Sequence, residues 1–151
     1  MMNMFVTGAT GVLGTSLVPR LVEAGYTVWA MNLTLWIIAG LLAAVFLVAG
    51  TSKLFIPQEK LAKAPGAGWV LDFSAGFVKA LGAVEILGAV GLILPALLDI
   101  APILVPLAAV GLALDMAGAA IVEFRRHEFK HALGNLIYLA LAVFVAWGRF
   151  W

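Results

Sequence analysis

A long stretch without charge restricts what this chain can fold into. Residues 24–52 contain no Asp, Glu, Lys or Arg, and the segment 33–52 is apolar almost throughout. A helix needs about 20 apolar residues to cross the hydrocarbon core of a bilayer. Trp36 lies near one end of this segment, at the depth where tryptophan is enriched in membrane proteins. The segment 33–52 is therefore predicted to be a membrane-spanning helix.

The composition of the whole chain supports the same conclusion. Of its 151 residues, 64% are hydrophobic and 11% are charged, against about 45–50% and about 25% in ordinary soluble domains. This composition leaves little room for a soluble globular enzyme. The net charge of +1 gives no basic surface for a nucleic acid. The absence of cysteine excludes disulfide scaffolds, iron–sulfur clusters and cysteine nucleophiles.

Three further apolar stretches bring the number of predicted spans to four. They are, in chain order, residues 73–98, 102–122 and 133–147. The polar segment 53–72 contains a Pro-Gly break and a short amphipathic piece near 58–64, and the segment 123–131 is a charged connector. The predicted fold class is all-α, a four-helix transmembrane bundle.

Basic residues near the ends of the spans predict how the bundle is oriented. The two polar segments carry most of them, namely Lys53, Lys60, Lys63, Arg125, Arg126 and Lys130. The short segment around Asp99 carries none, and the C-terminal end carries Arg149. Short loops rich in Lys and Arg stay on the cytoplasmic side of a membrane. Loops 53–72 and 123–131 are therefore predicted to be cytoplasmic, in a multi-pass protein of the cell membrane.

The first thirty residues have a different pattern. The sequence TGATGVLG places Gly8, Gly11 and Gly14 between a short apolar strand and an amphipathic helix, and a second strand is predicted at 26–30. Glycines in such a turn let backbone N–H groups approach a pyrophosphate at a helix N-terminus. Residues 1–30 resemble the NAD(P)-binding start of extended short-chain dehydrogenases, as a truncated, Rossmann-like β-α-β fragment.

The fragment ends before a dinucleotide-binding sheet is complete. Met31 and Asn32 stand where that family has the residue that contacts the ribose, and the chain has no Tyr-x-x-x-Lys pair. Two short strands bury too little surface to hold a dinucleotide. We therefore expect the three glycines to be the remnant of a cofactor motif that does not bind NAD(P). We also expect a domain boundary directly before Met31, with Met31 as the natural start.

Four segments after residue 30 carry a second resemblance. They are AGTSKL at 49–54, KALGAVEILGAVGLILP at 79–95, LDMAGAAIVEFRR at 114–126 and AWGR at 146–149. With these segments, residues 31–151 resemble the DoxX-like family of small four-helix membrane proteins. The resemblance implies a multi-pass membrane protein, and some members are named as subunits of quinone-linked oxidoreductases. Where the family often has a histidine after the third helix, this chain has Glu123.

Several polar side chains fall inside the predicted spans, where an unpaired charge costs several kcal/mol. They are Lys53, Lys79, Glu85, Asp115, Asn135 and Tyr138. At about 1.5 Å per helical residue, all of them lie in the half of the bilayer next to the two polar loops. We expect them to converge on one polar intramembrane pocket. Three roles remain open: an ion-pair network that fixes helix packing, a pocket for a quinone or another amphiphile, and a proton or ion path.

Two further patterns have simpler interpretations. Small residues recur at 82–91 and at 111–119, which predicts close packing of helices. His127 and His131 have the i, i+4 spacing of metal ligands. They lie in a basic connector at the membrane surface, where solvated side chains are commoner, so a metal site is not predicted.

With the DoxX-like resemblance, these patterns predict the protein's role. The resemblance implies an accessory or quinone-associated subunit of a membrane oxidoreductase system, which we expect to have no independent catalysis. The alternative is a small membrane transporter or assembly factor with no redox chemistry. The expected partners are the lipid bilayer, a membrane oxidoreductase subunit and a second copy of the chain. Quinone is the candidate cofactor, and no nucleic acid is expected.

Overall fold

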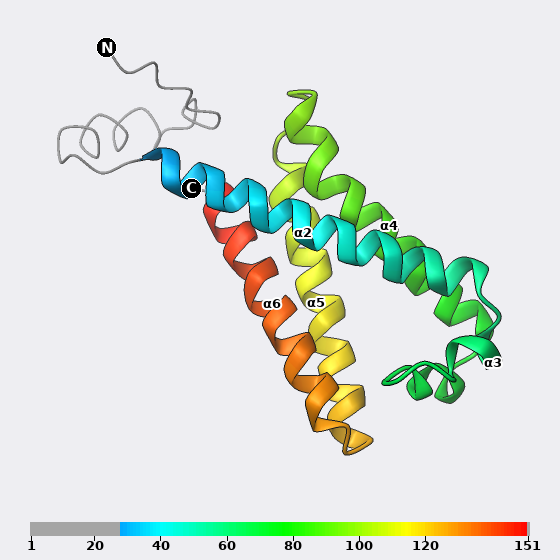
Figure 1. Cartoon of the computed structure of the whole chain (residues 1–151). Coiled ribbons are helices and arrows are strands. Elements are labelled where there is room, and N and C mark those ends of the chain that lie inside the picture. The colour runs from blue at the N-terminus through cyan, green and yellow to red at the C-terminus, as the bar shows by residue number, and fades with distance from the viewer. Residues whose placement is uncertain (1–27, 151) are drawn as a thin grey trace, which may run out of the picture.

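Four apolar segments form long helices in the computed structural model, which describes residues 28–150 (Figure 1). The long helices are α2 (Val28–Phe55), α4 (Ala75–Leu97), α5 (Leu104–Arg125) and α6 (Phe129–Phe150). A short helix α3 (Gln58–Leu61) and the 3₁₀ helix η1 (Gly68–Asp72) lie between α2 and α4. Residues 28–150 contain no strand, and the prediction of an all-α, four-helix fold is confirmed.

All four long helices are long and apolar enough to cross a membrane. The mean hydropathy of their most apolar windows lies between 1.6 and 2.4. Their outward side chains include Leu41, Leu87 and Leu114, which are 63%, 70% and 70% exposed. Such an apolar exterior is unfavourable in water and is solvated by lipid chains in a bilayer. The chain is therefore a multi-pass membrane protein.

The helices pack as two antiparallel pairs. Helix α2 lies along α4 and α5 lies along α6 (Figure 1). Contacts of α4 with α5 and of α2 with α6 join the two pairs. Each helix contributes to a common apolar core, with Leu42 and Phe46 from α2, Leu92 from α4, Leu112 from α5 and Val145 from α6. These side chains pack together and so hold the four helices in one bundle.

Helices α2 and α4 approach closely at a pair of glycines. A Cβ atom on Gly50 would lie 2.5 Å from the carbonyl oxygen of Gly82, and one on Gly82 would lie 2.7 Å from that of Gly50. A side chain of α5 likewise occupies the space where a Cβ atom on Gly88 of α4 would lie. In contrast, Gly111 and Gly118 of α5 have no neighbouring atom within 4 Å of their Cβ positions. The close packing predicted from small residues is therefore correct for α4 but not for the glycines of α5.

A tight turn ends α5 and starts α6. His127 adopts a left-handed backbone conformation with φ of 60°. Its N–H donates to the carbonyl oxygen of Phe124 at 3.1 Å, and the N–H of Glu128 donates to that of Glu123 at 2.9 Å. This pattern is a Schellman motif, which satisfies the last carbonyl groups of a helix.

The turn makes the connector shorter than predicted. The prediction placed the whole segment 123–131 outside the helices, but only residues 126–128 separate α5 from α6. The prediction is wrong at its first end because Glu123 is buried and hydrogen-bonded to Asn135, and so belongs to the packed bundle. It is wrong at its second end because α6 begins at Phe129, before the predicted start of the fourth span at residue 133.

The predicted strand at 26–30 is wrong for residues 28–30, which form the start of α2. The apolar sequence that favours a strand here continues into a longer apolar run, and the helix extends back into it. Met31 lies within α2, and the domain boundary expected directly before it stays a prediction. The motif glycines Gly8, Gly11 and Gly14 lie outside the described residues.

Candidate functional site

An ion pair inside the bundle joins α2 to α4. Lys53 Nζ donates a hydrogen bond to Glu85 Oε1, and the two side chains are only 12% and 2% exposed. Gly50 and Gly82 precede these residues by three positions, which is close to one helical turn. The glycine contact therefore brings the turns that carry the cation and the carboxylate close together.

Asp115 of α5 extends this pair to a group of three residues, which we call the triad: Lys53, Glu85 and Asp115. The Asp115 carboxylate interacts electrostatically with both of the others. One oxygen of each carboxyl group, Glu85 Oε2 and Asp115 Oδ2, is buried and has no hydrogen-bond partner within residues 28–150. The triad thus sets two carboxyl groups against one ammonium group inside the membrane-spanning region.

Asp115 also lines a groove of about 360 Å³, which we call the aromatic groove. One wall comes from η1 and α4 and consists of Trp69, Phe73, Phe77 and Leu81; the other comes from α5 and consists of Leu114, Asp115, Gly118, Ala119, Val122 and Glu123. The first wall is mostly aromatic, and the second combines small apolar side chains with two acidic ones. Its volume falls within the range of about 300–1,000 Å³ that is typical of small-molecule sites.

The aromatic wall is a continuous set of ring contacts. The rings of Phe73 and Phe77 stack with their centroids 4.9 Å apart, and Trp69 meets Phe73 edge to face at 6.0 Å. Lys53 Nζ lies 5.7 Å from the centroid of the Trp69 ring, within the range of a cation–π interaction. Lys53 therefore contacts both Glu85 of the triad and the aromatic wall.

Gln58 of α3 fixes the position of this wall. Its Nε2 donates to the backbone carbonyl oxygens of Val70 and, at 2.8 Å, of Phe73. Val70 is fully buried beneath the loop. This side-chain amide, with two backbone acceptors, joins α3 to η1 and to Phe73 directly before α4, and so fixes the backbone that carries the aromatic residues.

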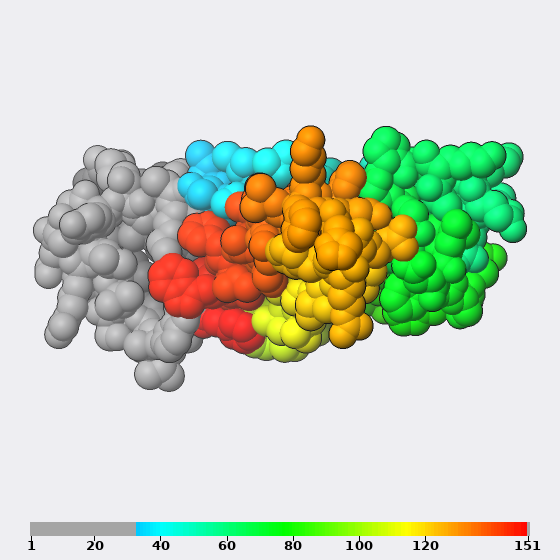
Figure 2. Space-filling view, turned by 90° about the horizontal axis from the view of Figure 1, so that it is seen from below, coloured from blue at the N-terminus to red at the C-terminus, as the bar shows by residue number. Residues whose placement is uncertain are grey.

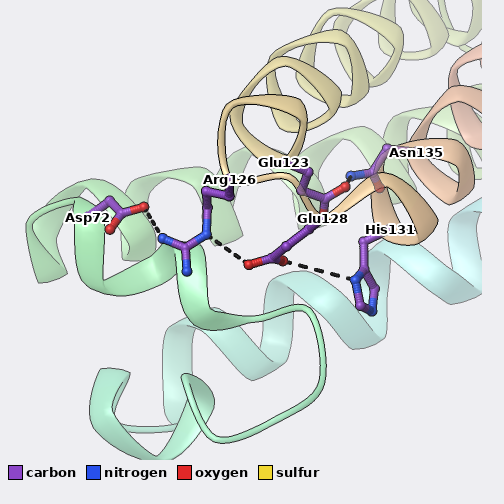
Figure 3. Close-up of polar contacts among 6 residues, drawn as sticks. All are labelled: Asp72, Glu123, Arg126, Glu128, His131 and Asn135. Carbon is purple, nitrogen blue, oxygen red and sulfur yellow. Dashed lines mark hydrogen bonds and ion pairs between the residues drawn. The ribbon is translucent and has the colours of Figure 1, made fainter.

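A second polar cluster, the loop cluster, joins the first loop to the α5–α6 turn and comprises Asp72, Arg126, Glu128 and His131 (Figure 3). Arg126 donates from Nη1 to Asp72 Oδ2 and, at 2.9 Å, from Nε to Glu128 Oε1. Glu128 Oε2 lies 4.0 Å from His131 Nδ1. The His131 ring also covers Gly66, where a Cβ would lie 2.4 Å from the ring.

The loop cluster closes the end of the bundle next to the aromatic groove. Seen from this end, the first loop lies against the α5–α6 turn (Figure 2). Hydrogen bonds to Glu128 and to Asp72 raise the pKa of Arg126 above its already high ordinary value. The Arg126 guanidinium therefore stays charged at every physiological pH.

Glu123 and Asn135 join α5 to α6 close to the loop cluster (Figure 3). Asn135 Nδ2 donates to Glu123 Oε2 at 2.8 Å. Glu123 is 6% exposed and lines the aromatic groove. An amide donor thus compensates a buried acid at the edge of the groove.

The predicted pocket residues fall into separate places. Lys53, Glu85 and Asp115 meet in the triad, whereas Asn135 pairs with Glu123. Lys79 is exposed on α4 and has no ion-pair partner among residues 28–150. The ring of Tyr138 meets Phe46 of the core edge to face at 6.4 Å. The structure does not bring Lys79 or Tyr138 into the triad.

Sequence reasoning did not assign Glu123 and Trp69 to the candidate site. Glu123 was placed in the connector, although it follows Asp115 by eight positions and so lies on the same face of a helix. Trp69 lies in an irregular loop, where no periodicity indicates its position. At the other end of the bundle, the Arg149 guanidinium lies over the Trp36 ring, 4.7 Å from its centroid.

Within residues 28–150, no group of three or more His, Asp or Glu side chains is placed to hold a metal ion. The two histidines of the predicted connector point to different contacts. His127 meets Phe129 edge to face at 6.0 Å, and His131 lies beside Glu128 and Gly66.

The triad, the aromatic groove and most of the four helices lie in a region that matches a known family. A model described as the DoxX-like family matches residues 37–145. The chain belongs to the DoxX-like family. No curated protein and no solved structure matches it. The DoxX-like match does not include residues 1–30, whose resemblance to short-chain dehydrogenases stays a prediction.

Proposed function

We propose that this DoxX-like protein is a quinone-associated accessory subunit of a membrane oxidoreductase system, without catalysis of its own. The observation that carries the proposal is the aromatic groove, which combines an aromatic wall with two acidic side chains where the first loop meets the membrane-spanning helices α4 and α5. Quinones and quinols combine a flat ring, two polar oxygen atoms and, in membranes, an apolar tail, and the groove offers a complement to the ring and to the oxygen atoms.

The aromatic wall suits the ring of such a ligand. Flat rings pack favourably against aromatic side chains at centroid separations of about 4.5–7 Å. Trp69, Phe73 and Phe77 already form such contacts with each other, so a further ring extends the same stack.

The acidic side of the groove suits the oxygen atoms of the reduced ligand. The two hydroxyl groups of a quinol donate hydrogen bonds, and a carboxylate accepts them. Asp115 and Glu123 both line the groove and supply its two carboxyl groups. Glu123 already accepts from Asn135 through one of its two oxygen atoms. We therefore expect the groove to favour quinol over quinone.

Redox chemistry would require a partner subunit in this proposal. The sequence has no cysteine and only two histidines, and those histidines lie in the loop cluster and the α5–α6 turn rather than in the groove. The chain is proposed to hold or position the quinol, while the partner exchanges electrons with it.

The alternative is a membrane transporter or assembly factor with no redox chemistry. The observation that favours it is the Lys53–Glu85 pair, since a buried ion pair between two helices can fix their packing or line an ion path without any ligand. The variant Glu85→Gln, studied in the native membrane, distinguishes the two functions by whether the protein assembles and whether the parent complex reduces quinone. Lost assembly favours the alternative, and intact assembly with lost quinone reduction in the parent complex favours the proposal.

Photolabelling tests the proposal directly. The full-length protein in lipid nanodiscs is illuminated with an azido-quinone, in its oxidised and reduced forms, and the labelled residues are identified by mass spectrometry. We expect labelling at 69–81 and 114–123 that excess unlabelled quinol suppresses. Trp69→Ala should reduce this labelling, whereas Trp147→Ala, which alters an apolar groove between α5 and α6, should not. Labelling spread over all lipid-facing surfaces, or equal in both variants, would contradict the proposal.

We further propose that the first loop and the α5–α6 turn face the cytoplasm. Lys60, Lys63, Arg125 and Lys130 are exposed at this end of the bundle, as the positive-inside rule requires. Because the chain lacks cysteine, single-cysteine variants give an unambiguous test. A membrane-impermeant maleimide should label Asp99→Cys in intact cells and Lys60→Cys only after lysis. The reverse pattern would invert the orientation.

A further inference from the structure

The triad carries more negative than positive charge. Lys53 supplies one ammonium group, and Glu85 and Asp115 supply two carboxyl groups. Glu85 is 1% exposed, and Asp115 is only partly exposed, toward the aromatic groove. An excess charge in the interior of a membrane protein is strongly unfavourable unless it is neutralised. The triad therefore requires one further positive charge.

The surroundings of Glu85 do not supply that charge from another side chain. Lys53 from α2 and Asp115 from α5 are the charged groups that act on Glu85, and among the described residues α6 contributes none. From η1, Trp69 presents an uncharged ring beside Lys53. Glu123, the other acid of the groove, is hydrogen-bonded to Asn135.

Two oxygen atoms mark where the missing charge can be held. Lys53 occupies Glu85 Oε1, whereas Glu85 Oε2 and Asp115 Oδ2 are both buried and lack a hydrogen-bond partner within residues 28–150. Two carboxylates offer only acceptors, but a protonated carboxyl group is also a donor. One proton would remove the excess charge and provide the donor that these acceptors lack.

We infer that Glu85 and Asp115 together bind one proton at neutral pH, and that Lys53 limits the number to one. Asp115 lines the aromatic groove, so the proton can exchange through the groove without crossing the packed core. The triad is then a proton-binding site within the membrane-spanning region. This inference goes beyond the proposed quinone association, because it depends on the triad and needs no ligand in the groove.

Infrared spectroscopy of the full-length protein in lipid nanodiscs tests the inference. A protonated carboxyl group has a carbonyl stretching band that is distinct from the bands of a carboxylate and shifts in D₂O. We expect this band in the wild-type protein at neutral pH. Glu85→Gln and Asp115→Asn should each remove it completely, since the remaining carboxylate is balanced by Lys53. Lys53→Gln should increase it about twofold, because both acids must then be neutral.

Asp99→Asn is the matched control, since it makes the same chemical change at the opposite end of the bundle, and it should leave the band unchanged. If the wild-type protein shows no such band at neutral pH, the inference is overturned. This result does not depend on whether any variant folds. Loss of the band in one carboxamide variant but not in the other would show a single independent acid and would also overturn it. So would loss of the wild-type band when Na⁺ replaces choline at constant ionic strength, because the site would then hold a metal cation.

Discussion

The close contact of Gly50 with Gly82 determines how α2 and α4 pack and hence where Lys53 and Glu85 meet, so Gly50→Ala is an informative perturbation. The added Cβ would lie 2.5 Å from a backbone oxygen, and ordinary contact begins near 3.4 Å. The two backbones must therefore separate by about 0.9 Å at this point, since no side chain can rotate away. Overpacking of this kind costs about 1–3 kcal/mol, while alanine in a helix gains about 1 kcal/mol over glycine.

Gly40→Ala in the same helix supplies the matched control. Gly40 has no neighbouring atom within 4 Å of its Cβ position, so this variant shares the gain in helix propensity and lacks the clash. We expect Gly50→Ala to be less stable than Gly40→Ala by about 1–3 kcal/mol. The assay is reversible unfolding in mixed micelles with increasing SDS, followed by circular dichroism. Equal stability of the two variants would refute the argument that backbone contact sets the spacing of α2 and α4.

Three further predictions concern the ends of helices and the loop cluster. His127→Gly should stabilise the protein by about 1 kcal/mol in the same assay, since glycine adopts the left-handed conformation without strain; a lower stability would contradict this. Ser74→Ala should lower the free energy of unfolding by about 1 kcal/mol, because the Ser74 hydroxyl accepts from the N–H of Phe77 at 3.2 Å and caps α4. Ser52→Ala is the control and should lower it less, because the Ser52 hydroxyl bonds at 2.8 Å within α2. Arg126→Gln should speed limited proteolysis of the segment 57–73, and high salt should do the same to the wild type; an unchanged rate would show that Gln58 and the buried loop residues suffice.

The spans could be predicted because length and apolarity are properties of the local sequence. An apolar segment of about 20 residues must form a helix in lipid, where every backbone polar group needs a partner within the segment. The structure confirms four such helices. The ends of the helices were predicted less accurately, since the end of α5 depends on the hydrogen bond between Glu123 and Asn135 of another helix. Such a contact between helices leaves no periodic signal in the sequence.

The candidate site, too, could be predicted only in part from the sequence. Depth along a helix follows from residue number, and this is why Lys53, Glu85 and Asp115 could be assigned to one half of the bilayer. The direction in which a side chain points relative to the other helices does not follow from its number. Lys79 satisfies the same depth criterion but lies on the exposed face of α4, and Trp69 reaches the groove from a loop whose position depends on Gln58.

The sequence by itself therefore determined that this chain is a four-helix membrane protein with acidic and basic residues inside its spans, because hydrophobicity acts through each segment separately. The tertiary structure decided which of those residues meet. The glycine contact between α2 and α4, the position of α5 beside them and the fixed loop around η1 together produce the triad and the aromatic groove. Each of these depends on contacts between segments far apart in the chain, whose geometry is set only when the helices pack.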